Sequence, residues 1–169
     1  MMRTFFLLFV PLAALTACHD ECSTETCTDF ARVVIETTDG TWVDGDYSLE
    51  LEADDAVYSC TFTTPDDAPE TATWQPIDCT PKINAFLVPL CESHGVLLPA
   101  SESCSPLPGK FNLLAEAPGT PKKVRSVLTR GDETVLDDTR NIPLYETVQP
   151  NGPECAPTCQ QYGGVSVIP

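Results

Sequence analysis

Nine cysteines are the residues of this chain with the widest chemical scope. A thiol can be acylated, can pair in a disulfide, or can bind a metal as thiolate. Histidine occurs only at His19 and His94, and Cys91-x-x-His94 is the nearest approach to a pair of metal ligands. Paired C-x-x-C motifs, which zinc sites commonly use, do not occur. We therefore predict no metal ligand, and we interpret the cysteines as sites of lipid attachment and disulfide formation.

Cys18 stands at the end of a short apolar segment. Arg3 precedes an apolar run over residues 5–15, which contains Pro11. The run is shorter than the roughly 20 apolar residues that cross a bilayer, and it matches a secretory signal. The tetrapeptide Leu15-Thr16-Ala17-Cys18 resembles the lipobox of bacterial lipoproteins. The resemblance implies that residues 1–17 are removed and that Cys18 carries a diacylglyceryl group and a further acyl chain such as palmitate.

The other cysteines form an even set, as a disulfide framework requires. They are Cys22, Cys27, Cys60, Cys79, Cys91, Cys104, Cys155 and Cys159. Chain order predicts Cys60–Cys79 and Cys91–Cys104, each contributing roughly 3 kcal/mol by the chain-entropy model. The remaining four lie in two clusters near the ends of the domain. They either join across, stapling the first strand to the last, or close within each cluster, and the sequence favours neither.

Acidic pairs are the second group of candidate residues. Asp44/Asp46, Asp54/Asp55, Asp66/Asp67 and Asp137/Asp138 could in principle do acid–base work or bind Ca²⁺. None has EF-hand spacing, and aspartate is a common turn residue. We interpret them as turn residues and keep an enzyme or enzyme-accessory domain with acidic loops, with or without Ca²⁺, as the alternative.

Motifs of known enzyme classes are missing from the sequence. It contains no G-x-S-x-G pentad, no phosphate-binding loop and no H-E-x-x-H. His94 lies beside Ser93 in an expected loop, where a solvent-facing role is the default. We predict no catalytic residue and no cofactor.

Three further features are candidate recognition elements. Trp42 and Trp74 could be exposed binding aromatics, although packing is the default for both. The sequence Pro150-Asn151-Gly152-Pro153 is turn-forming and is expected to aim Cys155 and Cys159.

The elements that position these residues are β-strands. Residues 47–52 and 57–63 alternate apolar and polar side chains around Asp54-Asp55, which predicts a hairpin with Tyr47, Leu49 and Leu51 facing a core. Further strands are predicted over residues 30–38, 83–90, 111–115, 122–130, 133–137, 144–148 and 164–168. Residues 64–81 and 91–109 are predicted loops.

Seven to nine short strands without a capped helix predict an all-β fold. We expect a single antiparallel β-sandwich over residues 30–169, immunoglobulin-like or transthyretin-like and braced by disulfides. Residues 1–17 are the expected signal peptide and residues 18–29 a lipid-anchored tether. The formal net charge of −16 and pI of about 4.1 argue against nucleic acid as a partner.

The chain resembles small cysteine-rich envelope lipoproteins of Gram-negative bacteria with large genomes. The matching pieces are the lipobox, the Cys22/Cys27 pair, residues 44–47, residues 145–147 and, most specifically, residues 150–159. The resemblance implies an immunoglobulin-like sandwich and membrane attachment through the lipid on Cys18, and no known activity.

From these features we expect a non-enzymatic structural or binding module in the cell envelope. The expected location is the outer membrane, on its periplasmic face or at the cell surface, with a protein or a glycan as partner.

Overall fold

The chain folds into β-strands joined by turns and loops. The computed structural model describes residues 25–64, 66–93, 96–99 and 105–168, and no helix occurs in these ranges. In chain order the strands are β1 (Phe30–Thr37), β2 (Gly45–Ala53), β3 (Ala56–Thr64), β4 (Gln75–Pro76), β5 (Asp78–Thr80), β6 (Asn84–Ser93), β7 (Val96–Pro99), β8 (Phe111–Pro118), β9 (Lys123–Arg130), β10 (Glu133–Asn141), β11 (Glu146–Val148) and β12 (Cys159–Ile168).

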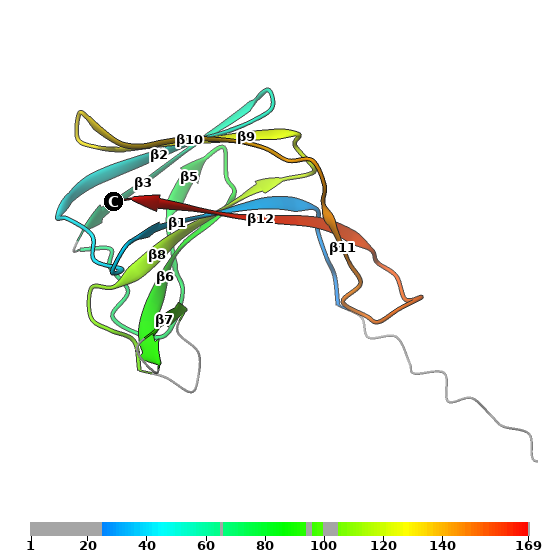
Figure 1. Cartoon of the computed structure of the whole chain (residues 1–169), viewed down its shortest axis with the longest axis horizontal. Helices are drawn as coiled ribbons and strands as arrows, with labels where there is room; N and C mark the ends of the chain where they lie inside the picture. The colour runs from blue at the N-terminus through cyan, green and yellow to red at the C-terminus, as the bar shows by residue number, and fades with distance from the viewer. Residues whose placement is uncertain (1–24, 65, 94–95, 100–104, 169) are drawn as a thin grey trace, which may run out of the picture.

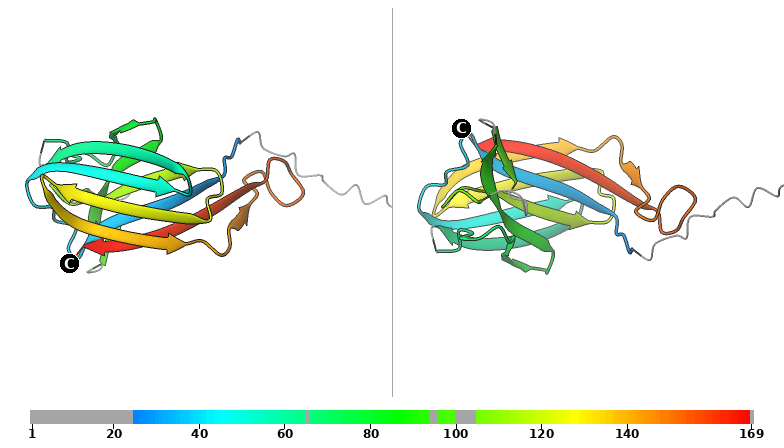
Figure 2. Two further views of the ribbon diagram at one scale, coloured as in Figure 1. Left: turned by 90° about the horizontal axis from the view of Figure 1, so that it is seen from above. Right: turned by 90° about the horizontal axis from the view of Figure 1, so that it is seen from below.

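Two sheets make up the fold. One has seven strands in the order β11-β12-β1-β8-β6-β4, with β7 paired to β6, and the other has five in the order β10-β9-β2-β3-β5. They face one another as two layers (Figures 1 and 2). Every strand pair is antiparallel except β1 with β12, which run parallel. The predicted all-β, antiparallel-rich sandwich braced by disulfides is confirmed.

Alternation of side chains builds the core between the sheets. Tyr47, Leu49 and Leu51 of β2 are buried, as predicted, while the residues between them face outward. In β3, the neighbouring strand, Cys60 pairs with Leu49 and Phe62 with Tyr47. Since alternate residues of a strand point to opposite faces, this register brings the apolar residues of both strands to one core.

β8 is the most buried strand. Six of its eight residues, Phe111–Ala115 and Ala117, are buried, because β8 lies between β1 and β6 near the middle of the larger sheet. Residues 111–115 of β8, which include Asn112, therefore do not alternate between buried and exposed positions. The predicted strand over residues 111–115 is present and extends to Pro118.

Two predicted loops contain strands. Residues 64–81 include β4 and β5, and residues 91–109 include the end of β6 and the whole of β7. These segments have two to four residues each or contain proline, so they show no alternation that a sequence pattern could reveal. They form strands because long partners are available: β5 pairs with β3, and β4 and β7 pair with β6.

β12 is longer than predicted. It begins at Cys159 rather than Gly164 and pairs with β1 in register from Phe30↔Gln161 to Thr37↔Ile168. Its first half contains Gln160, Gln161 and Gly163, which do not favour strands by themselves. The hydrogen-bonding partners β1 and β11 determine its conformation.

The molecule has two distinct ends (Figure 1). β1 begins at the end that also holds β11 and the start of β12, and we call this the stapled end. β1 finishes at the other end, beside the last residues of β12 and the β9–β10 turn, and we call this the open end. Eight residues of β1 separate the two by roughly 25 Å at the usual rise of a strand.

Candidate functional site

Cys18 lies outside the described residues, as do Cys22, Cys104, His19 and His94. Lipid attachment to Cys18 therefore stays a prediction, and so does the pairing of Cys91 with Cys104. Cys91 and Cys155 are both disulfide-bonded. Every cysteine within the described ranges is thus engaged in a disulfide.

The disulfide Cys60–Cys79 is present, as predicted. β3 directs Cys60 into the core, and β5 places Cys79 directly opposite it in the sheet. The bond therefore joins the short edge strand β5 to a central hairpin. A strand of three residues gains little from its own backbone pairing, so the covalent link helps to hold it in place.

The disulfide Cys27–Cys159 defines the stapled end. It joins the segment before β1 to the first residue of β12. The sequence left open whether the two terminal clusters pair with each other or within themselves, and this bond pairs one cluster with the other. Three residues past Cys27 the parallel pairing of β1 with β12 begins. The crosslink therefore reinforces the one strand pair that joins the start of the domain to its end.

Hydrogen bonds support this crosslink. Asn151 accepts from the backbone N–H of Glu25 at 2.9 Å and donates to the Glu25 carbonyl at 2.9 Å and the Ala156 carbonyl at 2.7 Å. Asp29 accepts from the backbone N–H of Gln160 at 2.7 Å. The predicted turn at residues 150–153 thus binds the incoming chain, and part of the segment expected to be a tether lies against the domain.

Asp54/Asp55 and Asp66/Asp67 lie in turns, as predicted. The turn interpretation is wrong for Asp46, which lies in β2, and for Asp137/Asp138, because β10 continues past them to Asn141. Asp54 accepts from the backbone N–H groups of Lys122 and Lys123, and Asp137 pairs with Arg125 at 2.7 Å. Asp46 and Asp67 meet at Thr63, one accepting from its hydroxyl and the other from its backbone N–H. Within the described ranges no group of three or more His, Cys, Asp or Glu is arranged to hold a metal ion.

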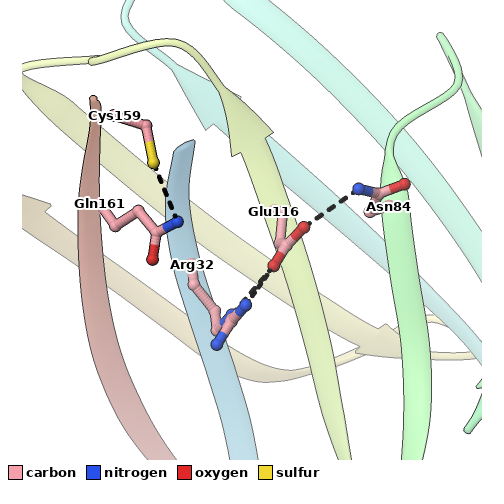
Figure 3. Close-up of polar contacts among 5 residues, drawn as sticks. All are labelled: Arg32, Asn84, Glu116, Cys159 and Gln161. Atoms are coloured by element: carbon pink, nitrogen blue, oxygen red, sulfur yellow. Dashed lines mark hydrogen bonds and ion pairs between the residues drawn. The ribbon is translucent and has the colours of Figure 1, made fainter. Parts of the chain in front are cut away.

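A polar row crosses the outer face of the larger sheet (Figure 3). Arg32 of β1 donates to Glu116 of β8 at 2.6 Å and 3.0 Å, and Asn84 of β6 donates to the same carboxylate at 3.1 Å. The guanidinium also lies 4.8 Å from the centroid of the Phe30 ring. Because these groups bond to one another, we interpret the row as a link between three strands.

Trp42 belongs to an aromatic cluster at the open end. It is 6% exposed, donates from Nε1 to the Phe111 carbonyl at 2.8 Å, and stacks on the Phe111 ring at 5.0 Å. Tyr47 and Phe62 contact its edges at 5.3 and 5.6 Å. Packing, the expected role, is confirmed for Trp42. Trp74 is 42% exposed and tilts against Phe86 at 5.7 Å.

A cavity of about 390 Å³ opens beside this cluster, between the two sheets at the open end. We call it the end cavity. β1 and its following turn contribute Thr37 and Thr41, and β12 contributes Ile168 from the larger sheet. From the other sheet come Tyr47, Arg130 and Glu133. Trp42 also lines it, so one cavity combines aromatic, hydroxyl and charged groups.

The first wall of the end cavity is a rigid turn. Asp39 accepts from the backbone N–H of Thr41 at 3.0 Å and from its hydroxyl at 3.1 Å. These bonds favour the carboxylate, so the pKa of Asp39 is lowered. Gly40 has φ of 75°, a conformation that glycine adopts without strain, and accepts from the backbone N–H of Phe111 at 3.1 Å.

The opposite wall is the β9–β10 hairpin. Arg130 and Glu133 flank its turn and pair at 2.7 Å, and this hydrogen bond raises the pKa of the guanidinium. Gly45 makes room for the arginine, because a Cβ there would lie 3.2 Å from Arg130 Cγ. Gly45 also has φ of 148°, so a larger residue would adopt a strained conformation there and would have to displace the Arg130 side chain slightly.

Sequence reasoning did not find the end cavity. It predicted strands over residues 30–38, 122–130 and 133–137, but nothing in their spacing shows that the turns after residues 38 and 130 meet at one end of the sandwich. The threonine and arginine residues that flank both turns were the available signal, although such residues are common on any surface.

These observations define the class of the protein: a disulfide-braced, all-β sandwich with a polar cavity at one end. No protein-family model matches the chain, and neither a curated protein nor a solved structure matches it. The part of the chain that the structure describes holds no helix with the length and hydropathy for a membrane crossing.

Proposed function

We propose that the protein is a lipid-anchored module of the bacterial cell envelope that binds a partner and is not an enzyme. One observation carries this proposal: every described cysteine is in a disulfide. Disulfides persist in exported proteins and are rare in the cytosol. Cys18, the cysteine that completes the odd total of nine, stands at the position that the lipobox pattern assigns to the lipid.

The arrangement of the two ends supports an anchored role. The described chain begins at the stapled end, where Cys27 and Asn151 hold it against the loop before β12. A lipid on Cys18 would be attached nine residues before Cys27, the residue that the crosslink holds at the stapled end. The end cavity lies at the other end of β1 and would be directed away from the membrane surface.

The charge of the chain also supports this role. A formal charge of −16 gives the domain a repulsive exterior, which disfavours nucleic acid and anionic membrane surfaces as partners. Attachment would then depend on the acyl chains. Two or more chains hold a protein firmly at a membrane, whereas one holds it marginally. We expect a protein or glycan partner at the outer membrane, at its periplasmic face or the cell surface.

Mass spectrometry of the N-terminal peptide tests the anchor. We expect a mature chain that begins at Cys18 and carries acyl mass, and we expect Cys18→Ser to move the protein from the membrane to the soluble fraction. Cys27→Ser is the matched control, because it removes a disulfide cysteine and leaves the lipobox intact. A mature chain that begins elsewhere, or a Cys18 without acyl mass, would contradict the proposal.

A further inference from the structure

We propose that the end cavity binds a neutral sugar residue. This inference rests on the proposed function of an envelope-displayed binding module and specifies its ligand. The volume of about 390 Å³ lies within the range of about 300–1,000 Å³ that is usual for small-molecule sites. Its position between the sheets, at the end of the domain away from Cys27, leaves it open to an extracellular or periplasmic ligand.

The polar groups of the end cavity suit a polyhydroxyl ligand. Thr38, Thr41 and Thr134 are exposed and line it. The hydroxyls of Thr38 and Thr134 can both donate and accept, whereas the Thr41 hydroxyl already donates to Asp39 and is left to accept. Arg130 is 28% exposed and has five N–H groups, of which Nη2 donates to Glu133. A ligand that offers donors and acceptors in equal measure, as a sugar does, can satisfy these groups together.

Aromatic side chains provide the apolar contact that a sugar also needs. Trp42 and Tyr47 both line the end cavity, and both are fixed: Trp42 by its bond to Phe111 and Tyr47 by its hydroxyl bond to the Val43 carbonyl at 2.8 Å. Rigid aromatic groups give contact area with little loss of side-chain entropy. Trp42 is 6% exposed and Tyr47 5% exposed, so the C–H groups of a pyranose ring can contact only the part of each ring that borders the end cavity.

Charge excludes the main rival ligands. Asp39 already accepts from Thr41 and Glu133 already pairs with Arg130, and within the described ranges no group of three or more His, Cys, Asp or Glu is arranged to hold a metal ion. An anionic sugar would be repelled by a chain of charge −16. A purely aliphatic ligand would leave threonine and arginine groups desolvated without partners, which is unfavourable.

Trp42 offers a direct readout of binding. The chain contains two tryptophans, so Trp74→Phe in the full-length protein leaves Trp42 as the single fluorophore. We expect its emission to change in a saturable way with glucose, galactose, mannose or N-acetylglucosamine. Glucuronic acid should bind at least tenfold more weakly than the best neutral sugar. Backbone amide chemical shifts in NMR provide a second readout if the emission does not change.

Two variants locate the site. In the Trp74→Phe protein, Thr134→Val and Arg130→Gln should each weaken binding by at least fivefold. Thr139→Val, on the same strand β10 but outside the end cavity, should bind as the parent does. A thermal melt confirms that each variant is folded.

The outcomes are decisive. The inference is overturned if no neutral sugar changes either readout at any soluble concentration, if both cavity variants bind normally, or if the shifted amides lie elsewhere on the domain. Acylated Cys18 in a protein that binds no sugar would overturn this inference alone. Sugar binding without acylation would overturn the proposed anchor alone.

Discussion

Asn112 carries a buried polar atom without a partner. Its Oδ1 has no hydrogen bond in the structure, and its Nδ2 donates to Glu36 over 3.4 Å. An unsatisfied buried amide oxygen destabilises a fold by about 1–3 kcal/mol. We therefore expect Asn112→Leu, a change of similar volume, to raise the free energy of unfolding by about 1 kcal/mol in urea denaturation.

Asn84 is the matched control for Asn112. It lies on the same outer face of the larger sheet and donates to Glu116 at 3.1 Å. Asn84→Leu removes a hydrogen bond that is satisfied in the parent, so the free energy of unfolding of this variant should be equal to or lower than that of the parent protein. If both leucine variants gained the same stability, added apolar surface would explain the effect, and the argument from the Asn112 oxygen would be wrong.

Trp42 combines a hydrogen bond with ring packing, so it should be sensitive to a small change. Trp42→Phe removes the Nε1 donor that binds the Phe111 carbonyl and leaves a gap among Tyr47, Phe62 and Phe111. We expect a loss of about 2–4 kcal/mol in chemical denaturation, from the cavity and the unpaired carbonyl together. Trp74→Phe should cost less than about 1 kcal/mol because Trp74 is 42% exposed.

Strands β10 and β12 show how the two sheets are joined at one edge. Arg140 of β10 donates to the Val165 carbonyl and, at 3.2 Å, to the Ser166 hydroxyl, while Ser166 donates to Asp138 at 2.6 Å. Gly164 leaves room for this contact, because a Cβ there would lie 3.0 Å from Arg140 Nη1. The group therefore blocks part of the open edge of β12, which limits pairing with other chains.

Asp138 makes this edge sensitive to acid. The Ser166 hydroxyl lowers the pKa of Asp138, with a smaller contribution from Arg140. A carboxyl whose pKa is lower in the folded state stabilises the fold above its unfolded pKa of about 3.9, and the contribution is lost as the pH falls through the folded pKa. We expect Asp138→Asn to cost on the order of 1 kcal/mol at pH 7.

Denaturation at several pH values tests this sign. The stability difference between the parent and Asp138→Asn should be constant from pH 7 to about pH 5 and should shrink below about pH 4. Asp137→Asn is the control on the neighbouring residue, since Asp137 pairs with Arg125 at the surface, where water and salt screen such pairs. If the stability difference between the parent and Asp138→Asn grew as the pH fell, the lowered pKa of Asp138 in the folded state would be contradicted.

Alternation made some strands predictable and others not. β2 and β3 have one face in the core and one in water, so their residue pattern records their position. β5 and β7 are three and four residues long, and β4 has two, so partner strands alone determine them. The same holds for the first half of β12, which is polar and pairs with β1.

The candidate site also has features that the sequence could predict and features that it could not. Cysteine counting predicted Cys60–Cys79, since the two are neighbours in the set, and offered Cys27–Cys159 as one of two alternatives. The end cavity needed three-dimensional information, because Thr41 and Arg130 are far apart in sequence and meet only through the register of β2 with β9. The spacing of residues in the sequence does not indicate the register of β2 with β9.

At the scale of the whole molecule, the polarity of the domain follows from its topology. Parallel pairing of β1 with β12 places the beginnings of both strands at the stapled end and their last residues at the open end. The two strands run side by side along the domain (Figure 2). The covalent crosslink and the end cavity are therefore separated by the length of β1. A ligand at the open end would not need to displace the crosslinked segment.

The disulfides Cys27–Cys159 and Cys60–Cys79 should differ in their effect on global stability because they close loops of different length. Cys27 and Cys159 are 132 residues apart, whereas Cys60 and Cys79 are 19 apart. The entropy of loop closure scales as (3/2)RT ln n, which favours the longer loop by about 1.7 kcal/mol. We expect the double variant Cys27→Ser/Cys159→Ser to lose more stability in urea than Cys60→Ser/Cys79→Ser.

Hydrogen exchange shows whether this loss is global. If Cys27–Cys159 restricts the unfolded chain, its removal should speed exchange across both sheets by a similar factor, since every core amide then exchanges through a more populated unfolded state. Faster exchange confined to residues 25–31 and 159–162 would show that the bond prevents only local fraying at the stapled end. In that case the parallel pairing of β1 with β12 would hold the domain closed without its crosslink.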